Sequence, residues 1–212
     1  MSLEIMLKTQ EGLDNRIISE KGIVWSEEER FRNTLVALDV ELSEFANEGR
    51  WFKVWSVNQE PNTKKWKGMQ WKDNEYGGVD PIHGTDEYSN PLLEEYIDAV
   101  HFFLSLANQK GWGELLYFAE EAIEDLRESG FDGGLNGAYL EMKRWLCVLA
   151  VEVDEENYIK QLGWSKHQFS FKNAWFIFIA IGMVEYNFTF EQIAEAYFAK
   201  NKINHERQTN GY

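Results

Sequence analysis

The sequence has few of the residues that disulfide-bonded, nucleic-acid-binding or membrane-spanning proteins need. Its only cysteine, Cys147, cannot form an intrachain disulfide, which fits a reducing compartment such as the cytoplasm. Lysine and arginine number 21 against 36 aspartates and glutamates, and the net charge of -15 argues against a surface for nucleic acid. The longest apolar run, residues 174–184, is far shorter than the ~20 residues that span a bilayer, and residues 1–10 lack the apolar core of a signal peptide. We therefore predict a soluble cytoplasmic protein that binds neither nucleic acid nor membrane.

Sustained strand alternation is also missing, whereas motifs that begin helices recur along the chain. Ser26 followed by Glu29 forms a capping box, and the pairs at residues 165/168 and 189/192 repeat it. Asn90-Pro91 places a proline at the first position of a helix. These features predict an all-α protein, a single domain over residues 1–212. The expected helices lie near residues 3–20, 27–50, 91–108, 112–129, 136–159, 166–186 and 190–206.

Prolines are scarce, and all of them fall in one stretch of the chain. Pro61, Pro81 and Pro91 lie within residues 57–91, together with several glycines. A connection this long is uncommon in a compact domain and is usually functional or disordered. Because Trp66 and Trp71 argue against plain disorder, we predict that residues 57–90 form a partly ordered insertion, a lid over the site.

Two pairs of acidic residues stand on either side of this insertion. Glu41 and Glu44 lie on the second predicted helix, and Glu95 and Asp98 lie on the third. Residues three apart share one side of a helix, so two such helices packed together would bring four carboxylates to one point. Hard divalent cations such as magnesium bind oxygen ligands and leave room for substrate phosphates. The spacing therefore predicts a four-carboxylate magnesium site for phosphate chemistry.

The alternative is that these acids simply face water. On the second helix, however, apolar residues flank the acidic stripe on both sides, and the plainly polar sector lies elsewhere. The third helix is apolar around most of its circumference, and its acids share the remaining strip with His101 and Ser105. Because buried carboxylates must be paired or coordinate a metal, the two helices together favour the metal site.

The C-terminal segment carries cations that could hold phosphates. Lys200, Asn204 and Arg207 fall on one helical face, and arginine can bind a phosphate through two hydrogen bonds. The alternative is an ordinary helix end whose cations complement the helix dipole. Spacing alone leaves both interpretations open.

Aromatic and amide residues offer candidates for binding a planar base. Trp51 and Trp55 follow the first acidic helix and could stack on a nucleobase, while Lys53 between them could reach a phosphate. The alternative is that these aromatics belong to the core. Near the start of the chain, Gln10 and Asp14 lie one helical turn apart and could hydrogen-bond a planar ligand edge.

His101, three residues after Asp98, raises the possibility of a carboxylate-bridged di-iron bundle. That site needs Glu-x-x-His on two helices, and only one comparable pairing exists here, in Asp form. His101 therefore fits better as a hydrogen-bonding group beside the acids or as a satisfied core histidine. Nucleophile motifs, glycine-rich phosphate loops and zinc-binding cysteines are absent, so water is the expected nucleophile.

Taken together, these motifs resemble the all-α dUTP pyrophosphatases of the dimeric type, relatives of the MazG-like NTP pyrophosphatases. The resemblance covers nearly the whole chain and follows the family's order. The matching stretches are Gln10-Glu-Gly-Leu-Asp14, Glu41-Leu-Ser-Glu44, Phe52-Lys-Val-Trp55-Ser56, Glu94-Glu-Tyr-Ile-Asp98 with His101-Phe102, and Lys200-Asn-Lys-Ile-Asn-His-Glu-Arg207-Gln-Thr-Asn-Gly-Tyr212.

The resemblance implies a MazG-like helical bundle with a central four-helix core, working as a homodimer. It also implies hydrolysis of dUTP, and of dUDP, to dUMP with two or more magnesium ions. By resemblance, Glu41, Glu44, Glu95 and Asp98 hold the metals, and Glu44 or Glu41 takes a proton from the attacking water, with Glu44 favoured. The residues expected on phosphate are Lys200, Asn204, Arg207 and Lys53, and those expected on uracil are Gln10, Asp14, Trp55 and His101.

Two departures from the family pattern bear on the substrate. The acidic pairs are separated by about fifty residues, more than in compact MazG-like relatives, so the insertion could alter closure or substrate range. Asp14 stands where many relatives carry asparagine, and a carboxylate cannot donate a hydrogen bond as an amide can. Two other hypotheses therefore stay open: a house-cleaning NTP pyrophosphatase with another nucleotide preference, and a catalytically silent helical protein that binds nucleotide or a partner.

Overall fold

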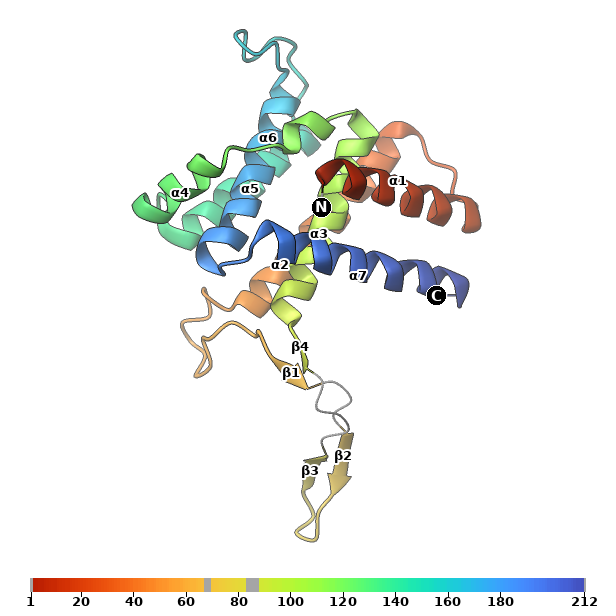
Figure 1. Ribbon diagram of the computed structural model, residues 1–212, viewed down its shortest axis with the longest axis vertical. Helices are drawn as coiled ribbons and strands as arrows, with labels where there is room; N and C mark the ends of the chain where they lie inside the picture. Colours follow the sequence, from red (N-terminus) through yellow and green to blue (C-terminus); the bar gives the residue numbers. More distant parts are fainter. Residues whose placement is uncertain (1, 67–69, 83–87, 212) are drawn as a thin grey trace.

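The computed structural model describes residues 2–66, 70–82 and 88–211, and in this part of the chain helices form the body of the protein (Figure 1). The helical elements are α1 (Leu3–Glu20), α2 (Glu27–Gly49), α3 (Pro91–Lys110), the short 3-10 helix η1 (Gly113–Leu116), α4 (Glu120–Ser129), α5 (Gly134–Val151), α6 (Lys166–Ala180), the π-helical turn η2 (Ile181–Glu185) and α7 (Phe190–Thr209). The all-α prediction is therefore confirmed. Within the described residues, no helix combines the length and apolarity that a membrane crossing requires.

The helices begin where their capping residues predict. Ser26 accepts a hydrogen bond from the Glu29 backbone, and the Glu29 carboxylate accepts one from the Ser26 backbone at 2.8 Å. The same reciprocal pairing begins α6 and α7. Asn90 caps α3, whose first residue is Pro91. These local bonds fix the starting points of both helices that carry the acidic pairs.

Two of the predicted helices differ from those observed. The segment expected to be one helix over residues 112–129 is divided by an extended stretch at residues 117–119, between η1 and α4. Side chains of α6 bind the carbonyl groups there: Trp175 donates to Leu116 O and Lys172 donates to Tyr117 O. The helix expected to reach residue 159 ends at Val151, and Lys166 pairs with Glu152 and Glu155 in the acidic stretch that follows.

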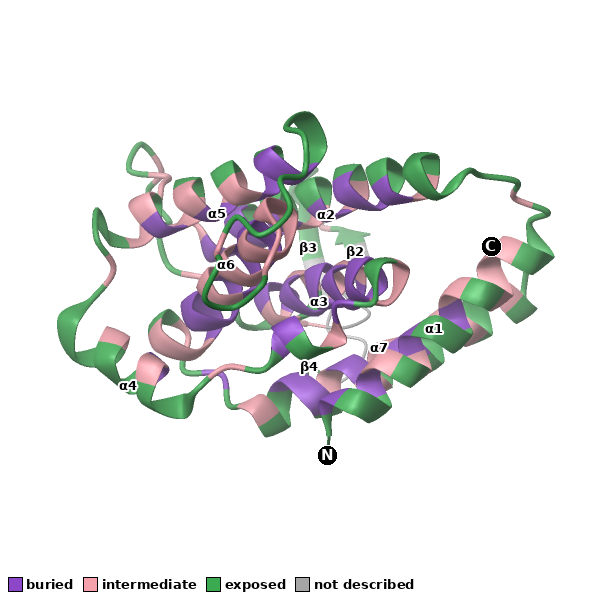
Figure 2. Ribbon diagram, turned by 90° about the horizontal axis from the view of Figure 1, so that it is seen from above, coloured by how far each residue is buried: buried purple, intermediate pink, exposed green. Residues whose placement is uncertain are grey.

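Helix α3 lies at the centre of the molecule and is buried over most of its length (Figure 2). Helix α2 packs along one side of it, and α1 and α7 lie side by side along another. The core between α3 and α6 is aromatic: Tyr96 stacks on Phe178 with centroids 4.3 Å apart, and Phe178 stacks on Phe103 at 5.0 Å. This packing buries the face of α3 that meets α6.

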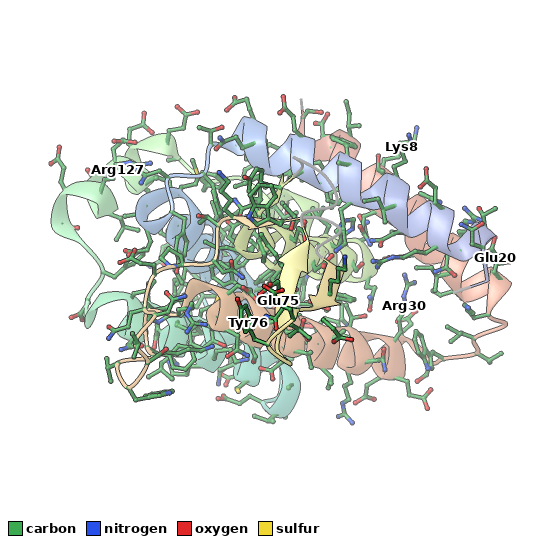
Figure 3. All side chains as sticks on the ribbon, turned by 90° about the horizontal axis from the view of Figure 1, so that it is seen from below. Lys8, Glu20, Arg30, Glu75, Tyr76 and Arg127 are labelled. Carbon is green, nitrogen blue, oxygen red and sulfur yellow. The ribbon has the colours of Figure 1, made fainter. Side chains whose placement is uncertain are left out.

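The insertion contains two short antiparallel ribbons that the sequence did not predict. Strand β1 (Lys65–Trp66) pairs with β4 (Tyr88–Ser89), and β2 (Gln70–Asp73) pairs with β3 (Val79–Ile82). The β2–β3 ribbon extends away from the helices in Figure 1, and its turn carries Glu75 and Tyr76, labelled in Figure 3. Several residues of the expected lid, 67–69 and 83–87, lie outside the described residues, and its role as a lid stays a prediction.

Candidate functional site

Three of the four expected carboxylates meet between α2 and α3. Glu41, Glu95 and Asp98 each offer one oxygen, and these oxygens all lie within 4.8 Å of one another. All three side chains are half-buried. Glu44 lies beside them but is exposed to solvent. The i, i+3 spacing thus brings together the residues that it predicted, with Glu44 at the rim of the group.

Burial, and then the crowding of negative charge, raises the pKa of two carboxyls in this cluster. Burial raises the pKa of Glu41 to about 7, and the charges of Asp98, Glu44 and Glu95 add to that rise. Burial also raises the pKa of Glu95 to about 7, helped by Asp98 and Glu44. Like charges this close disfavour full ionisation unless a cation stands among them. A set of carboxylate oxygens is the donor type that magnesium prefers, so the residues present fit such an ion.

Helix α7 brings a cation to the edge of the cluster. Lys200 Nζ lies 2.5 Å from Asp98 Oδ2, and both side chains are about one-fifth exposed. Asn204 and Arg207 follow on the next turns of α7, the first half-buried and the second exposed. One Lys200 charge stands against four neighbouring carboxyl groups, so the site has an excess of acidic groups that a further cation would balance.

The end of α7 is tied to α1 by Arg16. Its guanidinium donates to His205 O at 3.0 Å and to Thr209 Oγ1 at 3.0 Å, and it also pairs with Glu20 on its own helix. The segment that carries Asn204 and Arg207 is therefore held along α1.

The start of the insertion also joins the two acidic helices. Asn62 Nδ2 donates to Glu48 Oε2 at 2.6 Å, and the Asn62 backbone accepts from Leu92 and donates to Glu48 O. Glu48 lies one turn beyond Glu44 on the acidic stripe of α2. Asn62 thus fixes the end of α2 relative to the beginning of α3, a role that no motif indicated.

Gln10 of α1 is the centre of a buried hydrogen-bond network beside the acids. Its Nε2 donates to Asp14 Oδ1 at 2.7 Å and to Ser105 Oγ at 3.1 Å. Its Oε1 lies 2.6 Å from His101 Nδ1 and 3.1 Å from Tyr197 Oη. A primary amide has two N–H groups and an oxygen with two lone pairs, and each has a partner within reach inside the protein. The single Tyr197 hydroxyl proton is shared between Gln10 Oε1 and Met6 O, which is also 3.1 Å away. Gln10 therefore fixes the side chains around it.

The network also sets the state of His101. Because Gln10 Oε1 can only accept, the ring proton sits on Nδ1 and Nε2 keeps its lone pair. Burial lowers the pKa of His101 to about 3, and the charge of Lys200 lowers it too. His101 Nε2 is buried and has no hydrogen-bond partner among the described residues. The imidazole is thus a neutral acceptor, which agrees with a hydrogen-bonding group beside the acids.

A cavity of about 200 Å³ opens next to this network, between α1, α2 and α3. Its walls are mostly apolar, and its polar lining includes Asp14, Arg30 and Ser105. Burial raises the pKa of Asp14, and hydrogen bonds with Ser105 and Gln10 oppose the rise. Arg30 extends from α2 toward α1 (Figure 3), and its Nη2 lies 3.5 Å from Asp14 Oδ2. The full lining is Asp14, Ile17, Ile18, Ile23, Trp25, Arg30, Asn33, Thr34, Phe102, Ser105 and Gln109.

The cavity and the acidic cluster occupy the same pair of helices at different heights. Glu41 meets Asp98 at one level, and Thr34 bonds Gln109 at another, so α2 and α3 run antiparallel. Glu41 and Thr34 are seven positions apart on α2, and Asp98 and Ser105 are seven positions apart on α3, which corresponds to ~10 Å of helix in each case. This spacing suits a ligand with a planar ring at one end and phosphates at the other.

Two expected residues lie apart from this arrangement. Lys53 donates to Asn47 O at 3.1 Å, and Trp55 packs its ring against Phe52 with centroids 5.8 Å apart. Trp55 is 74% exposed, so it is not a core residue, whereas Trp51 is half-buried and contacts the core ring of Phe45. None of these contacts joins Lys53 or Trp55 to the acids.

Comparison with known proteins identifies a family across the chain. The sequence model of the dUTPase family matches residues 2–70 and 83–212, which include all the helices and both acidic pairs. The matched ranges leave out residues 71–82, most of the β2–β3 ribbon. A search of curated proteins found no match.

Proposed function

Because the chain belongs to the all-α dUTPase family and is therefore a dUTP diphosphatase, we propose that it hydrolyses dUTP, and also dUDP, to dUMP with two or more magnesium ions. The observation that carries this proposal is the pairing of a carboxylate cluster with a cavity about two helical turns away on the same two helices. A nucleotide with its base in the cavity would extend its phosphates toward the acids.

The acidic cluster would hold the metal. Glu41, Glu44, Glu95 and Asp98 would bind the ions, whose charge would stabilise the phosphate chain in the transition state. Glu44 is the exposed member of the group, so its carboxylate is open to a water molecule. In our proposal Glu44 takes a proton from the attacking water, and Glu41 assists. The water oxygen forms a bond to the α-phosphorus as the bond from that phosphorus to the oxygen bridging the β-phosphate breaks. Pyrophosphate leaves from dUTP, and phosphate leaves from dUDP.

The phosphates would be held by cations outside the carboxylate group. Lys200 is already at the cluster edge, with Asn204 and Arg207 farther along α7. We propose that these three residues bind the phosphate oxygens, with Lys53 contributing from the segment after α2. Since Arg16 holds the end of α7 on α1, it would act as a positioning residue for this set.

The uracil would lie in the cavity. Asp14 lines it directly, and His101 offers its unprotonated Nε2 from the neighbouring turn of α3. Gln10 would act through these two residues, because its own amide is fully used. Trp55, 74% exposed, would supply a stacking surface when substrate is bound.

Two features of the assembly belong to the same proposal. Exposed apolar side chains at Val36 and Val40 of α2 and Leu140 of α5 are suited to a homodimer interface, and light scattering that finds an active monomer would exclude it. Residues 57–90 would serve as the lid over the site. We place the enzyme in the cytoplasm.

The proposal is tested by product release from dUTP, dUDP, dCTP, dTTP and UTP, with and without magnesium. We expect selective, magnesium-dependent turnover of dUTP and dUDP that Glu44→Gln abolishes. Glu128→Gln is the matched control, since Glu128 is exposed on α4. Preferred turnover of other nucleotides would keep the acidic site but assign the protein to house-cleaning hydrolysis. Failure of the folded wild-type protein to turn over any nucleotide would overturn the proposal in favour of a binding role.

A further inference from the structure

Gln109, on the last turn of α3, lies at the wall of the cavity with its amide held in one orientation. Gln109 Nε2 donates to Thr34 Oγ1 at 2.9 Å. The Thr34 hydroxyl in turn donates its only proton to Arg30 O, at 2.8 Å. While it keeps this bond, Thr34 can only accept from Gln109, so turning the amide by half a rotation would cost the hydroxyl its bond to Arg30 O. Thr34 thus favours the observed orientation of the amide by one hydrogen bond, and we call this contact the lock.

The locked orientation leaves an acceptor at the cavity wall. Gln109 Oε1 is buried and has no hydrogen-bond partner among the described residues. Asp14 Oδ2 is likewise buried without a hydrogen-bond partner among the described residues, and the Arg30 guanidinium lies 3.5 Å from it. Buried polar atoms are rarely left unpaired in native proteins. Two such acceptors lining one cavity indicate that its ligand supplies N–H donors.

The reach of Gln109 matches the expected position of a base. Side chains on a helix lean back toward its N-terminus, so the Gln109 amide lies nearer to the level of Ser105 than its place in the sequence suggests. That level is ~10 Å from Asp98 along α3. The ring of Phe102, on the same helix, forms part of the cavity wall. A pyrimidine ring here would meet the acceptors along its edge.

We infer that Gln109, oriented by Thr34, makes this cavity select uracil over cytosine. The inference rests on the proposed function and specifies its base recognition. Uracil carries a proton on N3, which Gln109 Oε1 or Asp14 can accept, whereas cytosine carries a lone pair on N3. Arg30 is placed to donate to a carbonyl oxygen of the ring. An acceptor facing the cytosine lone pair repels it and stays unpaired, which is how polar sites reject analogues that lack a donor.

Substitutions of Thr34 and of Gln109 should change the preference for dUTP over dCTP in different ways. In Thr34→Val the amide is free to rotate and can present Nε2 to cytosine. The ratio of kcat/KM for dUTP to that for dCTP should fall at least tenfold, chiefly because dCTP hydrolysis rises. In Gln109→Met the acceptor is lost at similar volume, so kcat/KM for dUTP should fall at least tenfold with no gain for dCTP.

A double variant separates the lock from general damage to the cavity. Glutamate at position 109 presents an oxygen in either orientation, so Thr34→Val/Gln109→Glu should recover the preference for dUTP that Thr34→Val loses. Gln161→Met serves as the control, since Gln161 is exposed in the loop before α6. Affinity for dUMP and dCMP, measured calorimetrically, should follow the same order as kcat/KM, so that the result does not depend on turnover alone.

The role of Gln109 and the proposed hydrolysis of dUTP can be contradicted separately. Wild-type protein that hydrolyses dUTP, with Thr34→Val and Gln109→Met variants that discriminate as well as the wild type, would overturn the assignment of Gln109 and leave the proposed function intact. Wild-type preference for dCTP would overturn the assignment by showing that the cavity accepts an N3 lone pair. Wild-type protein inert toward dUTP would overturn both.

Discussion

The acidic cluster and the Gln10 network lie on neighbouring turns of α3, but they differ in how far their polar groups are paired. In the cluster, Glu41, Glu95 and Asp98 face one another, and Lys200 is the cation paired with one of them. In the network, every hydrogen-bonding position of Gln10 has a partner. The cluster therefore stays electrostatically unsatisfied, while the hydrogen bonds of Gln10 itself are complete and, among the described residues of its network, Asp14 Oδ2 and His101 Nε2 stay unpaired.

This difference separates a reactive site from a positioning one. Unpaired carboxylates are costly in the protein alone and gain stability only with a cation. Gln10 itself gains no hydrogen bond from substrate, but it holds Asp14 and His101 in fixed places beside the cavity. Changes to the cluster should therefore abolish activity with little loss of stability. Changes to Gln10 should lower stability and should affect activity only through Asp14 and His101.

The largest effect is expected from Glu95→Gln in the cluster. The amide keeps the shape of the side chain but removes a charge that would hold the metal. We expect kcat/KM for dUTP to fall at least about 1000-fold, equivalent to about 4 kcal/mol, while the fold survives. Steady-state kinetics with magnesium, together with circular dichroism, measure both quantities. Glu128→Gln should match the wild type, and an active Glu95→Gln enzyme would exclude Glu95 from the metal site.

A smaller but still large effect is expected from Gln10→Met in the network. The change leaves Asp14, Ser105, His101 and Tyr197 without their shared partner in a buried place, and such losses together cost about 2–4 kcal/mol. Urea unfolding should show this loss of stability. Gln161→Met should change stability by less than about 0.5 kcal/mol, as exposed substitutions usually do. Equal stabilities of the two variants would show that the network does not support the fold.

The two regions also differ in how far the sequence reveals them. Glu41/Glu44 and Glu95/Asp98 were predictable because i, i+3 spacing is local and the helices begin at recognisable caps. Lys200 and Asp98, 102 positions apart, were proposed separately, and only the packing of α7 on α3 brings them together. The family resemblance, and not the spacing, singled out Gln10 and His101 as residues of one site.

The structural features that the sequence did not predict depend on contacts between distant segments. The pairing of Gln109 with Thr34 spans 75 positions, and that of Tyr197 with Gln10 spans 187, so no periodicity indicates either. The break after η1 depends on donors from α6 that lie more than 50 residues away. The β2–β3 ribbon lacked clear alternation because its strands are only four residues each.

The smallest expected effect is the change with pH of the free energy of unfolding in the absence of metal. Burial and nearby charges raise the pKa of Glu95 from 4.5 to about 7, so ionisation is easier in the unfolded chain. Its contribution to stability is therefore complete below about pH 4.5 and is lost as the pH rises through about 7.

In EDTA, wild-type protein should lose about 1–2 kcal/mol of stability relative to Glu95→Gln between pH 4.5 and 8, a value reduced because the carboxyl is half exposed. Urea unfolding of both proteins at several pH values measures this difference. Magnesium at pH 8 should restore the wild type but not the variant, since only the intact cluster binds the ion tightly. Parallel pH profiles in EDTA would show that burial and the neighbouring acids do not raise the pKa of Glu95. The contrast with the satisfied Gln10 network would then disappear.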